Sequence, residues 1–432
     1  MLTRRDTLRL AALSALAVSG LSACGSTPEA GPVTDSGIDL ASSSLARTPG
    51  LVDGVPGVVG SLQGFAGRLY GKAPTDGNLI ISPFSVAMAL GMTVNGAVGK
   101  TRAEMLDVLG VTDLAAFNGG LNALTQKLES LAGPVKRGDG SKAEIALDSA
   151  NSLWGQRGEP WEKPFLDELA RDYGTGMRQV DYIADAERAR TLINQWTADQ
   201  THDKITDLIP EGVLDALTRL VLVNAIYLKA PWEKPFEPSM TKDAPFDGGR
   251  LTVPMMTGGE VPATYRAGDG WKAATLAYAG GSVAMTIVLP DRGRLGDVEA
   301  SLTGHGVQPY LAGGTATALQ VTMPKWTTRS SLGLKDALSE LGMPTAFDQI
   351  KADFSAMTTQ EQLYISAVLH QGFIAVDEEG TEAAAATAVV MSTTSAQIVD
   401  SFIVDRPFLY VIHDTEHGTP LFLGRVIDPP ES

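Results

Sequence analysis

The chain has 432 residues, 44% hydrophobic and 19% charged, a composition that supports a large buried core and excludes disordered and collagen-like chains. With 34 Lys and Arg against 50 Asp and Glu, the formal net charge is −16, which repels phosphate backbones and argues against nucleic acid as a partner. The single cysteine excludes an internal disulfide, a thiolate zinc cluster and a CxxC redox pair.

Residues 1–23 predict an export signal. Arg4 and Arg5 precede an apolar run that is too short to span a bilayer and has the length of a signal-peptide core. The arginine pair is weakly similar to a twin-arginine signal, so the general and the twin-arginine export routes both remain open. Cys24 directly follows the residues Leu-Ser-Ala, a pattern of bacterial lipoprotein signals. We therefore expect a lipid on Cys24 and an exported protein anchored to the extracellular side of the cell membrane.

Residues 24–57 are rich in Gly, Ser, Pro and Thr, and they contain few large apolar side chains. This composition predicts a flexible tether, because the segment cannot bury enough surface to order itself. No second linker of comparable length interrupts the rest of the chain. Residues 58–432 are therefore expected to form a single domain.

Helical patterns come early in this domain and strand patterns come late. Ser82 and Pro83 mark a helix N-terminus, and Gly110 is placed to end another helix. Alternating or continuous apolar runs predict strands over residues 217–229, 283–290, 319–326, 373–377, 406–414 and 421–429. This segregation favours an α+β fold over a repeating βαβ sheet.

None of the catalytic motifs that the sequence suggests is complete. Ser239 and Lys242 satisfy the SxxK spacing of serine acyl-enzymes such as β-lactamases, but they lie among prolines, and the SDN and KTG partner motifs do not occur. The Gly-Lys-Thr at residues 99–101 resembles the end of a phosphate loop, but Val94 stands where its leading glycine is required. His413 and His417 are four residues apart, but the run between them has the pattern of a strand and a turn, so no histidine pair has metal-ligand spacing on a helix. The chain is thus expected not to be an enzyme and to need no metal or cofactor.

The segment from Asp377 to Asp400 contains the most informative pattern. As a helix, its alanine-rich part would have no apolar stripe to bury. As a strand, Thr381 and every second residue after it form one face, which is small and uncharged before it becomes apolar. Such a face can enter the middle of an existing sheet without overpacking and without burying an unpaired charge.

The sequence resembles the serpin family over nearly all of residues 60–430, and the motifs that carry the resemblance occur in the family's order. They are EEGTEAAAAT from Glu378, NLIISPFS from Asn78, VNAIYLKAPWEKPF from Val223, MPKWTTRSSLGLKDALSELGM from Met323, ADFSAMT from Ala352, LYISAVLH from Leu363 and DRPFLYVIHD from Asp405.

The resemblance implies a fold of three β-sheets and about nine helices, with an exposed reactive-centre loop at about residues 378–400. A target serine protease would cleave this loop and form a covalent acyl complex, and the freed hinge would insert into the main sheet before the ester is hydrolysed. The protein would act as a monomer. The implied hinge residues are Gly380, Thr381, Glu382, Ala383, Ala384, Ala385, Ala386 and Thr387.

The resemblance also assigns structural roles around the sheet opening. Glu378 and Lys325 correspond to an ion pair at the top of the sheet, the breach, where Trp232 also lies. Four residues correspond to the shutter, the region where the sheet must part: Ser82, Ser85, Asn224 and His370. Small polar groups there are expected to form hydrogen bonds that rearrange on opening.

The family's usual distance from Gly380 places the cleaved bond between Thr394 and Ser395, and counting back from Phe402 places it after Ala396. We prefer the first count, because the sheet fixes the length of the inserted strand. Small, uncharged residues around the bond favour elastase-like or subtilisin-like proteases. The alternatives are a non-inhibitory serpin acting as a lipid-anchored binding module and, from the SxxK spacing, an acyl-enzyme hydrolase.

Overall fold

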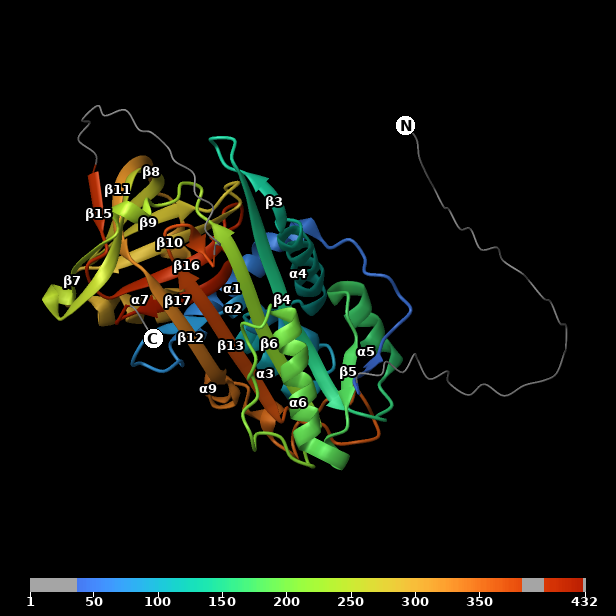
Figure 1. The fold of residues 1–432 in the computed structure, drawn as a ribbon. Helices are drawn as coiled ribbons and strands as arrows, with labels where there is room; N and C mark the ends of the chain where they lie inside the picture. The colour runs from blue at the N-terminus through green and yellow to red at the C-terminus, as the bar shows by residue number, and fades with distance from the viewer. Residues whose placement is uncertain (1–36, 383–399, 430–432) are drawn as a thin grey trace, which may run out of the picture. The chain divides into compact units, whose positions relative to one another are not determined.

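Two large β-sheets and nine α-helices make up the described residues 37–382 and 400–429 of the computed structural model (Figure 1). These residues belong to one compact unit that begins at residue 34. The predicted signal, Cys24, the hinge residues after Glu382, and Thr394 and Ser395 lie outside the described residues. Within the described ranges, no helix is both long and apolar enough to cross a membrane.

The main sheet has eight strands, and its two central strands are parallel neighbours. β6 (Leu220–Pro231) is buried along almost its whole length, as expected for a strand covered on both faces. The strand order is β1 (Asp39–Ala41), β5 (Met177–Val180), β4 (Lys142–Gln156), β6, β14 (Gly380–Thr381), β13 (Ala367–Val376) and β12 (Trp326–Gly333), with β3 (Gly133–Lys136) paired to β4.

The second sheet has nine strands, most of them antiparallel. Its order is β15 (Asp400–Ile403), β11 (Thr315–Pro324), β8 (Leu251–Gly268), β9 (Trp271–Ala277), β10 (Val283–Pro290), β16 (Phe408–Asp414), β17 (Pro420–Val426) and β2 (Leu79–Ile81), with β7 (Lys242–Phe246) beside β8. The third sheet that the family resemblance implies is continuous with this one. The reason is that β8 pairs with β11 over Met255–Tyr265 and with β9 over Ala263–Gly268.

The helices lie mainly in the first half of the chain, as the sequence predicts. They are α1 (Val55–Tyr70), α2 (Pro83–Val94), α3 (Gly99–Leu109), α4 (Leu114–Glu129), α5 (Lys163–Glu168), α6 (Tyr182–Gln200), α7 (Leu295–His305), α8 (Gln308–Leu311) and α9 (Lys335–Leu341). The predicted caps are confirmed. The Ser82 hydroxyl accepts from the Ser85 amide at 3.1 Å, and Gly110 ends α3 at a φ of 71°.

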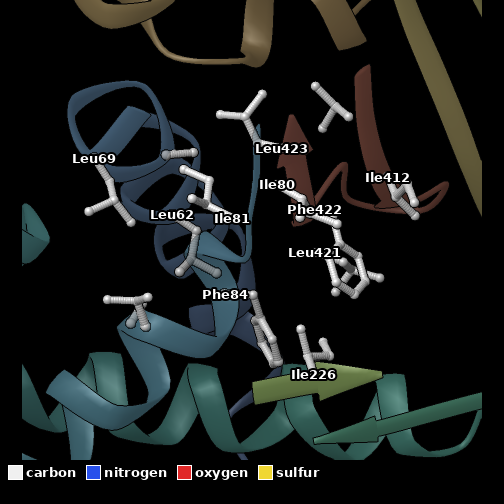
Figure 2. Packing of buried hydrophobic residues seen from close by; sticks show 14 of the residues in the cluster. Leu62, Leu69, Ile80, Ile81, Phe84, Ile226, Ile412, Leu421, Phe422 and Leu423 are labelled. Atoms are coloured by element: carbon white, nitrogen blue, oxygen red, sulfur yellow. The ribbon is translucent and has the colours of Figure 1, made fainter. Parts of the chain in front are cut away.

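The core lies where the first helices meet the C-terminal hairpin. All twelve residues of α2 are buried. Figure 2 shows Phe84 of α2 beside Ile226 of β6, and Leu62 and Leu69 of α1 in the same cluster as residues of β2 and β17. The packing therefore joins segments from both ends of the chain.

The prediction of a flexible tether over residues 24–57 is wrong for residues 37–57. Strand β1 pairs with β5, the Thr48 amide donates to the carbonyl of Arg171 at 2.9 Å, and α1 begins at Val55. Composition failed here because the segment is ordered by backbone hydrogen bonds to distant parts of the chain. It buries few apolar side chains of its own.

Candidate functional site

The site is a gap between two neighbouring strands of the main sheet. β6 and β13 pair directly over Val221–Ile226 and Ala367–Gly372. Beyond this stretch they separate, and β14 takes the place between them, with Gly380 opposite Pro231 and Thr381 opposite Ala230. The first two hinge residues therefore already occupy the sheet.

A tight turn leads from β13 into this gap. The Asp377 carboxylate accepts from the amides of Glu379 at 2.9 Å and Gly380 at 3.2 Å, and burial raises the pKa of Asp377. Gly380 has a φ of 150°, and a Cβ on it would lie 2.6 Å from the Cα of Pro231. Only glycine fits here, because the backbone of β6 passes so close.

Two aromatic side chains hold the inward face of the hinge: Tyr278, which follows β9, and Trp232, which follows β6. Thr381 is 1% exposed, and its hydroxyl lies 2.6 Å from the Tyr278 hydroxyl. Tyr278 stacks on Trp232 with ring centroids 4.6 Å apart, and the Trp232 indole donates to the carbonyl of Asp377 at 3.0 Å. The predicted breach residue Trp232 therefore contacts the hinge turn. Tyr278 was not predicted, because no motif around it distinguishes it from core tyrosines.

The structure brings the predicted ion-pair partners together at the base of the loop. Lys325 Nζ lies 2.8 Å from Glu378, and the Thr241 hydroxyl donates to the same carboxylate at 2.6 Å. Burial acts to raise the pKa of Glu378, but the hydrogen bonds from Lys325 and Thr241 outweigh it and leave the pKa lowered. Glu378 thus stays ionised and fixes the start of the turn.

A second ion pair lies where the hinge leaves the sheet. Glu382 has a φ of 51°, which is unusual for a residue other than glycine, and its side chain is 6% exposed. Lys204, from the segment between α6 and β6, lies 2.7 Å from the Glu382 carboxylate. Burial, and then the negative charge of Glu382, raise the pKa of Tyr227 on β6. Lys204 was missed because nothing in its sequence neighbourhood indicates a partner so far along the chain.

The four predicted shutter residues form one buried hydrogen-bonded cluster below the gap. The Ser82 amide donates to His370 Nε2 at 2.9 Å, so the Nδ1 hydrogen of His370 points to the Asn224 side-chain oxygen, 2.6 Å away. The Ser85 hydroxyl donates to Asn151 of β4 at 2.5 Å. Asn151 is the member that sequence reasoning missed, and it faces Asn224 across β4 and β6.

The cluster predicts that acid destabilises the fold through His370. Complete burial lowers the pKa of His370 to about 4, against about 6.5 in an unfolded chain. Because the unfolded state binds the proton first, the stability that neutral His370 contributes is present above pH 6.5 and is lost as the pH falls toward 4. This loss is on the order of 3 kcal/mol.

Denaturant unfolding at pH 7.5 and pH 4.5 measures this effect. We expect the wild type to lose about 2–3 kcal/mol more than His370→Gln between the two pH values. The second buried histidine, His413, also has its pKa lowered by burial, but it is present in both proteins and cancels. Equal pH dependence in the two proteins would contradict the assignment.

The two residues of the SxxK spacing do not form a catalytic pair in the structure. Ser239 lies in a short 3-10 turn, and Lys242 begins β7, so they do not share a helix. Among the described residues, no three His, Cys, Asp or Glu side chains are grouped so that they can hold a metal ion.

Comparisons with known proteins agree on one family. A family model described as "Serpin (serine protease inhibitor)" matches residues 61–429. An uncharacterized serpin-like protein of Thermococcus kodakarensis is 36% identical over 367 residues, which are 83% of this chain and 82% of that protein. Leukocyte elastase inhibitor A of Mus musculus is 33% identical over 83% of this chain and 94% of its own.

Solved structures give the same result. The thermophilic serpin tengpin in its native state has a TM-score of 0.78 at 26% identity, covering 90% of this chain and 97% of its own. Human thyroxine-binding globulin in complex with its hormone has a TM-score of 0.75 at 26% identity, covering 88% of this chain and 100% of its own.

Proposed function

Because the chain belongs to the serpin family, we propose that it inhibits serine endopeptidases by loop cleavage followed by insertion of the freed loop between β6 and β13. The observation that carries the proposal is the gap between these strands, whose first positions Gly380 and Thr381 already fill. Glu382, which follows them, is already paired with Lys204, and the next residues, Ala383 to Ala386, are small enough to enter a packed sheet.

Trapping of the protease starts with the nucleophilic attack that the protease makes on any substrate. The serine of the protease adds to the carbonyl of the bait residue, the peptide bond breaks, and an ester joins protease and inhibitor. The residues after Thr381 are then free to continue β14 down the gap. Each new ladder hydrogen bond contributes roughly 0.5–1.5 kcal/mol, so about a dozen residues contribute on the order of 10 kcal/mol. This is sufficient to move the attached protease and disturb the oxyanion site that hydrolysis of the ester requires.

Incubation with a panel of serine proteases tests the proposal. The expected result is a complex of protease and inhibitor that survives SDS and contains one copy of each. A binding module, the alternative suggested by the structural similarity to a globulin that carries a hormone, would leave every protease free.

We expect elastase-like and subtilisin-like proteases to be trapped and trypsin to be little affected. Met391 to Ala396 contain no Arg, Lys or aromatic residue. The carboxylate in the specificity pocket of trypsin would therefore have no positively charged partner. The proposed bait bond joins Thr394 and Ser395. Mass spectrometry of the released C-terminal peptide should find a fragment beginning between Ser395 and Gln397. A different start, or fast trapping of trypsin, would show that the bait is misplaced.

We also propose that the protein is exported and held at the cell surface by a lipid on Cys24. Cys24→Ala is expected to move the protein from the membrane fraction to the soluble fraction, since no other attachment is proposed. Ser36→Ala, a substitution of similar size outside the signal, serves as the control. Continued membrane association of the Cys24→Ala protein would refute the anchor.

A further inference from the structure

The first described residues lie at the end of the main sheet that is farther from the hinge. The hinge pairs with the last residues of β6, so Leu220 at the start of β6 marks this far end. Gly155 of β4 pairs with Leu220, and Gln179 of β5 pairs with Gly155. Asp39 of β1 pairs in turn with Gln179. In Figure 1 the arrow of β4 points toward this end, whereas the arrows of β6 and β13 start from it.

Arg157 fixes the chain at this end. It directly follows β4, and its guanidinium lies 2.6 Å from the Asp39 carboxylate and donates to the carbonyl of Gly37 at 2.6 Å. Because β1 is antiparallel to β5, Gly37 lies beyond Asp39 in the direction of the far end. Residues 25–36, which we call the linker, join Gly37 to Cys24. The linker is therefore attached to the domain at the far end of the main sheet.

Insertion of the cleaved loop would carry the bait residue to the same end. β14 is antiparallel to β6, with Thr381 opposite Ala230, so each further loop residue would lie opposite the preceding residue of β6. In this register Met391 would lie opposite Leu220, and the proposed bait residue Thr394 would lie three residues farther on. The attached protease would then travel about 36 Å, the length of β6 at about 3.3 Å per residue.

The trapped protease would therefore share one end of the inhibitor with the linker. From β1 to the inserted strand, across β5, β4 and β6, there are four strand spacings. At about 4.8 Å each, they place the bait residue about 20 Å to the side of β1. A protease of about 240 residues has a radius of gyration near 18 Å and hence a diameter of about 45 Å. A body of this size would fill the space around the linker.

The length of the linker matches the size of such a protease. The twelve residues 25–36 span at most about 40–43 Å when fully extended. They include Glu29 and Asp35 and no basic residue, so an anionic lipid surface does not attract them. A linker a third as long would reach only about 14 Å, much less than the diameter of the protease.

We propose that the linker is a spacer that makes room for the trapped protease between the inhibitor and the membrane. The hinge lies at the end of the domain away from the anchor, and insertion brings the protease to the end that faces the membrane. The length of the linker therefore decides whether an anchored inhibitor completes insertion. The inference rests on the proposed function, since it needs both an inserted loop and an anchor at Cys24.

Vesicles with a defined attachment site test the spacer. Cys24 is the only cysteine, so protein that starts at Cys24 is joined to phosphatidylcholine vesicles at one site through a maleimide lipid. The compact unit begins at residue 34, so loss of residues 1–23 leaves it complete. The shortened variant lacks residues 26–33, and the matched control carries Gly and Ser residues in equal number at these positions. The measured quantity is the amount of inhibitor consumed for each elastase-like protease trapped in an SDS-stable complex.

On vesicles, the shortened variant should consume at least fivefold more inhibitor per trapped protease than the matched control, because obstructed insertion lets the ester hydrolyse. In solution, with the Cys24 thiol blocked, the two proteins should trap the protease equally. Equal trapping on vesicles would overturn the spacer role while leaving the proposed function intact. If neither protein traps a protease in solution, the proposed function fails and the spacer role with it.

The direction of travel is tested separately by energy transfer from a fluorophore on the protease to a dye in the vesicle. A protease whose catalytic serine is replaced by alanine binds the uncleaved loop and marks the starting position. The active protease, once trapped on the same anchored wild type, should show stronger transfer because it has moved toward the bilayer. Equal or weaker transfer in the trapped complex would overturn the inference.

Discussion

Thr381→Arg is expected to abolish the covalent protease complex and to turn the inhibitor into a substrate. Thr381 is buried against Tyr278 between β6 and β13, and a guanidinium there would lose its water without gaining an acidic partner. The hinge would be kept out of the sheet, so cleavage would end in hydrolysis of the ester. SDS gels with an elastase-like protease should show cleaved inhibitor and free protease, with at least a tenfold loss of complex.

The fold should survive this substitution, because β14 contributes only two residues to the sheet and the hydrophobic core lies elsewhere. Thr381→Ser is the matched control, since it keeps the hydroxyl that faces Tyr278. It should retain the covalent complex. A complex of undiminished yield with Thr381→Arg would disprove insertion at this position.

Cleavage of the loop is expected to raise the melting temperature sharply. The inserted strand would pair with the separated parts of β6 and β13 and add on the order of 10 kcal/mol. At an unfolding entropy of about 2.1 cal/mol/K per residue, 1 kcal/mol shifts the melting temperature of a domain of this length by roughly 1.3 °C, so a rise of about 10–15 °C follows. Calorimetry on intact and metalloprotease-cleaved protein measures it.

The same cleavage of Thr381→Arg provides the control for the heat experiment. There the peptide bond is equally broken, but the hinge cannot enter, so the melting temperature should change little. If intact and cleaved wild type melt together, the loop does not insert.

Local chemistry made part of this structure predictable. Ser82 caps its helix through its own hydroxyl, and Gly110 ends another through its left-handed backbone, so neither depends on distant partners. The alternation from Thr381 onward placed the threonine on a face that can be buried, and the structure buries it. The family motifs added the shutter, in which Ser82 and Ser85 meet Asn224 and His370 from distant parts of the chain only in the folded protein.

The remaining features depend on contacts that no sequence window contains. The order of residues 37–57 comes from β5, from α4 and from the carbonyl of Arg171, all distant in sequence. Lys204 and Tyr278 reach the hinge from segments whose own sequences indicate only a loop and a strand. The composition of a segment describes its intrinsic tendency to order and leaves out the surface that receives it.

The pairing of β2 with β17 has a consequence for synthesis. Asn78, just before β2, bonds Asp428 across 350 positions of the chain, and β2 finds its strand partner only when β17 arrives. During translation or export, β2 and the helices packed on it cannot complete their packing until nearly the whole polypeptide is present. A premature stop that removes only β17 would leave the apolar edges of β2 and β16 without partners, and such edges promote aggregation. Short C-terminal truncations should therefore impair the yield of folded protein more than loss of the first residues does.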